Sequence, residues 1–137
     1  MKIIICGAGE VGFSLAKYLS SENMQVTVID EDTEKLNKMT SAIDVRSIVG
    51  KTYNPNILDE AAVKDADLLI AVSENDESNI LVCEMAKILF NVPNTIARIK
   101  EKELLKEKWL DLFSDKGFKI DNIISPEIEV ANMLARL

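Results

Sequence analysis

Short apolar runs alternate along the chain with longer segments in which apolar residues recur on one side of a helix. Continuous apolar runs of this length are typical of parallel strands that are buried on both faces. The runs predict strands at residues 3–6, 26–30, 45–49, 67–72, 95–99 and 121–124. The amphipathic segments predict helices from residue 10, at 32–41, at 55–62, after the turn at 73–77 as far as residue 91, at 102–113 and at 126–137.

The strict alternation of strands and helices indicates an α/β fold. Such units form parallel sheets with right-handed crossovers and helices on both faces. We expect a doubly wound six-stranded parallel sheet in the order 3-2-1-4-5-6, in which the first and fourth strands are neighbours. Ligands of such sheets bind above the carboxyl ends of these two strands. The 137 residues, 47% of them hydrophobic, suffice for one domain that spans residues 1–137.

The apolar positions also predict which side of each helix is buried. One face of the first helix carries Val11, Leu15, Tyr18 and Leu19. The buried side of the long helix that ends at residue 91 is marked by Leu81, Met85, Ile88 and Leu89. Trp109 and its apolar neighbours are expected in the core or under a covered edge.

A glycine-rich segment joins the first strand to the first helix and reads Gly7-Ala8-Gly9-Glu10-Val11-Gly12. In this pattern Gly7 allows a tight turn, Gly9 lets a pyrophosphate approach bare backbone, and Gly12 lets the helix lie close to the sheet. The phosphates would bind the free N–H groups at the positive start of the helix. The strand–turn–helix–strand order around the segment favours a Rossmann-like nucleotide site over a glycine turn with a purely steric role.

Asp30 ends the second strand, 18 residues after Gly12. A carboxylate at this place can accept hydrogen bonds from both hydroxyls of an adenosine ribose, and it would repel a 2′-phosphate. Glu10 does not suit an anion site, so we expect its side chain to face solvent or a partner subunit. The pattern therefore predicts binding of a dinucleotide or an adenine nucleotide without a 2′-phosphate.

The expected strand order brings the ends of the third, fourth and fifth strands to the same crevice. We expect the nucleotide to contact Gly7, Ala8, Gly9, Glu10, Val11, Gly12, Asp30, Glu31, Gly50, Lys51, Thr52, Ala71, Val72, Ser73, Asn75 and Arg98. We assign no catalytic residue and no metal ligand. Glu74, Asp76 and Glu77 form either a divalent-metal cluster or a set of acids that face the positive start of a helix, and we favour the second interpretation.

The charge balance narrows the classes of partner. Sixteen basic and 23 acidic residues give a net charge of −7, which argues against nucleic acid, because its affinity depends on basic residues that neutralise phosphates. We find no stretch of 18 apolar residues and no signal peptide, so we expect a cytoplasmic protein without a membrane segment of its own. Cys6 and Cys83 are expected as buried thiols. Histidine, the commonest general base, is absent.

The ordered set of motifs resembles the TrkA N-terminal family, also called the RCK or KTN domain. The resemblance covers the whole chain and rests first on the glycine segment and Asp30. It continues through Gly50, Asn54-Pro55, Ile57-Leu58, Ala66-Asp67, Ala71-Val72-Ser73, Asp76-Glu77-Ser78-Asn79 and Ile96-Ala97-Arg98-Ile99. The sequence Ile124-Ser125-Pro126-Glu127 is similar to the Trk accessory-subunit branch in particular.

The resemblance implies roles for several residues. In the family the glycine segment holds phosphates, the acid that matches Asp30 holds the ribose, residues 71–73 line the adenosine side, and the arginine that matches Arg98 reaches a phosphate. One departure is Gly50-Lys51-Thr52-Tyr53, where the family usually has Gly-Asp-Ala-Thr. Lys51 either favours additional phosphates or is simply solvated.

The same resemblance implies a non-catalytic sensor that binds NAD(H) or ATP/ADP and controls a membrane potassium transporter subunit. It also implies a homodimer or higher ring that lies at the inner face of the cell membrane through its partner. The family's second lobe would follow the last helix, so the chain is either a fragment of a longer subunit or a stand-alone domain. The alternative function is an NAD-dependent oxidoreductase, which the lack of histidine and of a substrate domain disfavours. A purely structural dimerisation module does not explain why Gly9 and Asp30 occur together.

Overall fold

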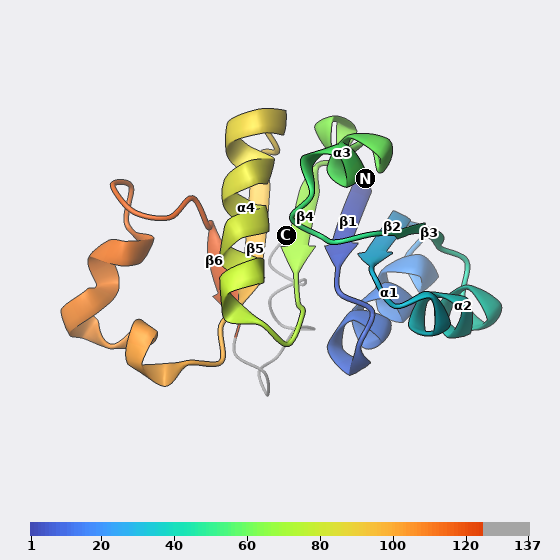
Figure 1. The fold of residues 1–137 in the computed structure, drawn as a ribbon, viewed down its shortest axis with the longest axis horizontal. Coiled ribbons are helices and arrows are strands. Elements are labelled where there is room, and N and C mark those ends of the chain that lie inside the picture. Colours follow the sequence, from blue (N-terminus) through green and yellow to red (C-terminus); the bar gives the residue numbers. More distant parts are fainter. Residues whose placement is uncertain (125–137) are drawn as a thin grey trace.

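The centre of the molecule is a parallel sheet. The structure, a computed structural model, describes residues 1–124. Six strands lie in the order β3-β2-β1-β4-β5-β6, which confirms the expected doubly wound topology (Figure 1). The strands are β1 (Lys2–Cys6), β2 (Gln25–Asp30), β3 (Arg46–Val49), β4 (Leu68–Ala71), β5 (Asn94–Arg98) and β6 (Asn122–Ile124). Because β1 pairs with β4, the direction of winding reverses between these two strands.

The helices follow the predicted pattern as far as β5. The α-helices are α1 (Glu10–Ser21), α2 (Thr33–Ala42), α3 (Pro55–Glu60) and α4 (Asp76–Phe90). Three short 3₁₀ helices are η1 (Val63–Asp65), η2 (Lys102–Leu105) and η3 (Glu107–Phe113). Pro55 occupies the first turn of α3, where a helix needs no N–H. The helix predicted at residues 126–137 lies outside the described residues.

The single helix predicted at residues 102–113 is wrong. Two 3₁₀ helices, η2 and η3, take its place, and Lys106 between them is extended. Neither contains a buried residue, and the stability of a protein helix comes mainly from the packing of an apolar face. In Figure 1 the segment extends away from the sheet beyond β6. Trp109 and Leu110 are therefore about half exposed, which corrects the expectation that they are covered.

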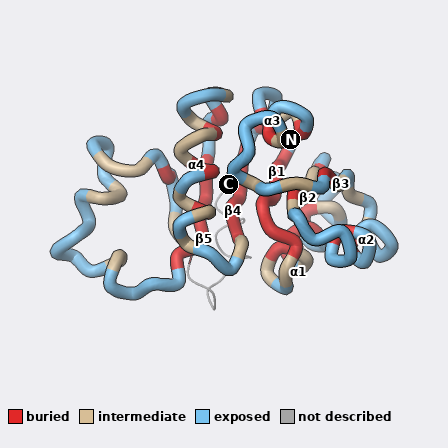
Figure 2. Tube along the Cα trace, viewed as in Figure 1, coloured by how far each residue is buried: buried red, intermediate tan, exposed pale blue. Residues whose placement is uncertain are grey.

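The core lies on both faces of the sheet. Ile4, Cys6, Leu69 and Ala71 face a cluster that α3 and α4 complete, whereas Ile3, Ile5, Leu68 and Ile70 face a cluster that α1 and α2 complete. Alternate residues of β1 and β4 thus enter opposite clusters, which is why both strands are continuously apolar. Figure 2 shows the buried stretches along these central strands.

The predicted buried sides of two helices need correction. In α1, Leu15 and Leu19 are buried as expected, but Tyr18 is exposed. In α4, Leu81, Ile88 and Leu89 are 45%, 63% and 54% exposed. The sheet-facing side of α4 consists of Asn79, Val82, Cys83 and Ala86. The prediction failed because an amide and two small side chains, which allow close packing, do not stand out in an apolar pattern.

Two further expectations concern thiols and membranes. Cys6 and Cys83 are free and buried, which confirms their expected state. Burial raises the pKa of both thiols, and nearby charges contribute at Cys83. Among residues 1–124, no helix is long and apolar enough to cross a membrane.

Candidate functional site

The glycine segment forms a tight turn between β1 and α1. Gly7 has a φ of +121°, and a Cβ at this residue would lie 2.9 Å from the Ser73 nitrogen. A Cβ at Gly12 would lie 1.9 Å from the Gly7 carbonyl oxygen. The positions thus require glycine for the two steric reasons that the sequence predicts. By contrast, a Cβ at Gly9 would meet no atom within 4 Å, so the backbone there is open.

Asp30 ties the end of β2 to the glycine segment. Its Oδ2 accepts a hydrogen bond from the Ala8 nitrogen at 2.7 Å, and its Oδ1 accepts one from the Asp32 nitrogen at 2.8 Å. Each carboxylate oxygen has two acceptor sites, so the carboxylate can still accept further hydrogen bonds. Asp30 therefore combines a structural contact with capacity for a ligand hydroxyl.

The start of α1 differs from the starts of the other described α-helices. Asp32, Asn54 and Asn75 accept backbone N–H groups in the first turns of α2, α3 and α4. Gly9, the N-cap of α1, has no side chain with which to do so. The first N–H groups of α1 consequently lack a side-chain partner, as a helix start that receives an anion requires.

A cavity of about 380 Å³ lies at the carboxyl ends of the central strands. The expected site residues that line it are Gly7, Gly9, Glu10, Val11, Asp30, Glu31, Lys51, Thr52, Val72, Ser73, Asn75 and Arg98. Ala8, Gly12, Gly50 and Ala71 do not line it. Ala8 and Ala71 are buried, Gly12 lies against Gly7, and Gly50 lies against Ile57. These four residues shape the turn and the strand ends.

The cavity also has walls that the sequence prediction omitted, namely Lys35, Tyr53, Glu74 and Ser78. Lys51 lies over the ring of Tyr53, with its Nζ 5.9 Å from the ring centroid. Lys35 lies in the first turn of α2, a few residues after Asp30 and Glu31. The β2–β3 side of the cavity thus carries two lysines beside two acids. Residues 50–53, which differ from the usual family sequence Gly-Asp-Ala-Thr, add positive charge and an aromatic ring to that side.

Arg98 lies at the other side of the cavity and is only 8% exposed. Its Nη1 donates to the Ser73 carbonyl oxygen at 3.4 Å and lies 3.6 Å from Oε1 of Glu74. Its Nε is buried and has no hydrogen-bond partner among residues 1–124. Buried polar groups in proteins nearly always have a partner. The guanidinium group of this cavity-lining residue is therefore incompletely satisfied.

Asn79 holds the strand ends around Arg98 together, and the sequence prediction did not include it in the site. Its side-chain nitrogen donates to the carbonyl oxygens of Arg98 and Ser73, at 2.9 and 3.1 Å. Its side-chain oxygen accepts from the nitrogen and the hydroxyl of Ser73, at 3.0 and 2.8 Å. The available signal was its place in the motif Asp76-Glu77-Ser78-Asn79, which the sequence analysis quotes for the family resemblance.

The acids between β4 and α4 bind protein groups. Glu74 Oε2 lies 3.2 Å from Lys100 Nζ, and this hydrogen bond, together with the charges of Arg98 and Lys100, lowers the pKa of the Glu74 carboxyl. Asp76 accepts hydrogen bonds from the backbone nitrogens of Lys100 and Glu101 at 2.8 and 2.9 Å. Asp76 thereby fixes the end of β5 to the start of α4. In the described part of the chain, no group of three or more acids or cysteines is placed to hold a metal ion.

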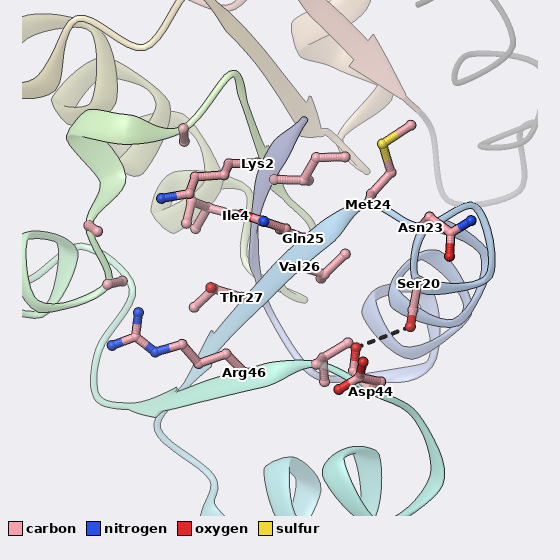
Figure 3. Close-up of a pocket in the computed structure, with 15 residues that line it drawn as sticks. Lys2, Ile4, Ser20, Asn23, Met24, Gln25, Val26, Thr27, Asp44 and Arg46 are labelled. Carbon is pink, nitrogen blue, oxygen red and sulfur yellow. Dashed lines mark hydrogen bonds between the residues drawn. The ribbon is translucent and has the colours of Figure 1, made fainter.

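A second cavity, of about 480 Å³, lies at the opposite end of the sheet (Figure 3). Lys2, Asn23, Gln25 and Arg46 are among the residues that line it, and Ser20 donates to the Asp44 carbonyl oxygen beside it. This cavity is the larger one, but it lies at the amino ends of the strands. Parallel doubly wound sheets bind ligands at the carboxyl ends, so we place the candidate site at the smaller cavity.

The sheet order and the glycine turn define a Rossmann-type domain. The TrkA-N domain family matches residues 3–126, and the chain belongs to this family. The chain is 42% identical over 136 residues to the Trk system potassium uptake protein TrkA of Azorhizobium caulinodans, covering 99% of this chain and 30% of that protein. It is also 42% identical over 137 residues to the TrkA of Vibrio alginolyticus, covering 100% and 30%. The chain thus spans about a third of the length of these relatives.

Solved structures share the fold at lower sequence identity. The TrkA-N domain of the inner membrane protein ybaL from Escherichia coli has a TM-score of 0.77 and 19% identity, over 98% of this chain and 94% of that chain. The GsuK channel bound to NAD has a TM-score of 0.72 and 19% identity, over 90% and 21%. GsuK bound to ADP has a TM-score of 0.71 and 18% identity, over 90% and 31%. These likenesses concern the fold alone.

Proposed function

We propose that the chain is a non-catalytic regulatory domain of a potassium uptake system, which binds NAD(H) or ATP/ADP in the 380 Å³ cavity. The observation that carries the proposal is the hydrogen bond between Asp30 and the Ala8 nitrogen. This bond joins the acid expected at the ribose to the segment expected at the phosphates. Both lie beside the start of α1, which has no side-chain cap and could receive a phosphate.

The names of the relatives and neighbours support the two parts of the proposal separately. Relatives that are 42% identical are named potassium uptake proteins. Structural neighbours are described as bound to NAD or to ADP. We infer that the domain acts through a membrane potassium transporter subunit, on the cytoplasmic side. For such control, the nucleotide must bind two arrangements of the assembly with different affinity, since equal affinity shifts no equilibrium.

We also propose that the domain works as a homodimer or a higher ring. The support for this proposal is the exposed side of α4, where Leu81, Ile88 and Leu89 face away from the sheet. An exposed apolar group of this kind is typical of protein contact surfaces. A second copy on this side would connect the assembly to α4, which begins beside Ser73 and Arg98 in the candidate site.

Calorimetric titration of the chain with NADH, NAD, ATP, ADP and NADPH tests the proposal. We expect binding of at least one of the first four, with NADPH the weakest because Asp30 and Glu31 would repel its 2′-phosphate. The absorbance of NADH is followed in the same samples. Binding without loss of NADH supports the regulatory domain. Loss of NADH in stoichiometric excess over the protein would instead establish the oxidoreductase, and absence of binding would refute the nucleotide site.

A further inference from the structure

We propose that Glu74 is a built-in competitor of the nucleotide, whose carboxylate occupies the place beside Arg98 and Lys100 that an anionic group of the ligand takes when it binds. The proposal rests on the proposed function and adds a regulating residue to that site. The ligand chemistry is a phosphate group of a nucleotide. A ligand without such a group would leave Glu74 in place.

The first argument is the incomplete satisfaction of Arg98. Glu74 Oε1 lies 3.6 Å from Arg98 Nη1, a distance at which the carboxylate balances the charge but makes no normal hydrogen bond. A phosphate oxygen at hydrogen-bond distance from Nη1 would make the charge-assisted hydrogen bond that Glu74 does not make. It would therefore offer Arg98 more than Glu74 does.

The second argument is the ease with which Glu74 can leave. Its side chain is 79% exposed, and its two ion pairs run to Arg98, which lines the cavity, and to Lys100 beside it. Exposed ion pairs contribute little to stability, because water screens them and ordering the side chains costs entropy. Lys100 lowers the pKa of the Glu74 carboxyl most, so the competitor is charged at neutral pH.

The third argument is that the backbone that carries the two cations does not depend on Glu74. Asp76 holds the backbone nitrogen of Lys100 at 2.8 Å, and Asn79 holds the Arg98 carbonyl oxygen at 2.9 Å. Neither contact involves Glu74. Removal of the competitor should therefore raise affinity for phosphate-bearing ligands rather than disturb the fold.

The test measures the dissociation constants of ATP and of adenosine for the whole chain and for Glu74→Gln. We expect Glu74→Gln to bind ATP roughly two- to fivefold more tightly, the range that exposed ion pairs allow, and to bind adenosine as the unchanged chain does. Glu77→Gln is the matched control, because it removes the same charge three residues further on and Glu77 makes no ion pair in the described structure. We expect it to leave the ATP affinity unchanged.

A double-mutant cycle separates displacement from a general charge effect. If Glu74 competes at Arg98, the gain from Glu74→Gln should disappear in an Arg98→Gln background. Arg98→Lys, which keeps the charge but loses the planar fork, serves if Arg98→Gln does not fold, and should reduce the gain. An equal gain in either background would overturn the proposal, as would unchanged ATP affinity in Glu74→Gln. Absence of ATP binding by every variant, combined with absence of NAD(H) binding, would overturn the nucleotide site itself.

Discussion

The side-chain nitrogen of Asn79 donates to the carbonyl oxygen of Arg98 at 2.9 Å, and this bond joins the first turn of α4 to the end of β5. The same amide makes three further hydrogen bonds to Ser73, at the end of β4. One buried side chain thus sets the spacing of two strand ends on one side of the cavity. It does so without lining the cavity itself.

Replacement of Asn79 by alanine should therefore lower the free energy of unfolding by about 2–3 kcal/mol, because buried groups of Ser73 and Arg98 lose their partners. Chemical denaturation measures the change. Asn37→Ala is the control, since Asn37 lies on the exposed side of α2 and only its backbone carbonyl oxygen takes part in side-chain hydrogen bonds among residues 1–124. A loss for Asn79→Ala no larger than that for Asn37→Ala would contradict the structural role.

Gly9, the N-cap of α1, and Gly12, in its first turn, should respond differently to replacement by alanine. Gly12→Ala places a methyl group against the Gly7 carbonyl oxygen, so we expect a loss of stability of about 2 kcal/mol or more. Gly9→Ala meets open space and should change stability by less than about 1 kcal/mol. It should nevertheless weaken nucleotide binding, because the methyl group occupies the space of the phosphate. Unfolding curves and titrations of both variants check the pair, and tight binding by Gly9→Ala would place the phosphates elsewhere.

The exposed side of α4 gives a prediction for the oligomer. Ile88→Glu should shift the chain toward the monomer in light scattering after size-exclusion chromatography, because a charge in an apolar contact is costly to bury. Tyr18→Glu on α1 alters another exposed apolar residue and should not. Equal mass for the unchanged chain and for both variants would contradict the proposal that α4 forms the contact between two copies.

The buried thiols give a prediction for pH. Burial raises the pKa of Cys6 and Cys83 above the ordinary value of 9.0. At pH 8 a disulfide reagent should therefore label both thiols of the unfolded chain much faster than those of the native chain. A raised thiol pKa means that the unfolded chain ionises first. The contribution to stability is therefore complete below pH 9 and falls as the pH rises above it. Rapid labelling of the native chain at pH 8 would contradict the burial of these thiols.

The strand order and the steric roles of Gly7 and Gly12 were predictable from the sequence. They depend on local patterns, namely apolar runs, glycine spacing and the rule that parallel strands need crossovers. The sheet-facing side of α4 was not predictable in this way, because Asn79 is buried through hydrogen bonds rather than through apolar character. The contact between Glu74 and Arg98 was not predictable either, since it depends on side-chain placement across two neighbouring strands. The 3₁₀ helices at residues 102–113 bury no residue fully, and Leu104, Leu105 and Phe113 are only partly buried against the core. A local pattern does not contain this tertiary packing.

The most direct test of the account is the affinity of Asp30→Asn for ADP and NADH. The amide keeps the shape of the side chain but loses the charge and one acceptor, so we expect at least about a tenfold loss of affinity with a folded chain, as judged by its unfolding curve. Asp44→Asn removes the same charge just before β3, at the opposite end of the sheet, and should bind as the unchanged chain does. If Asp30→Asn bound either nucleotide as tightly as Asp44→Asn, the carboxylate would not hold the ribose and the proposed site would be wrong.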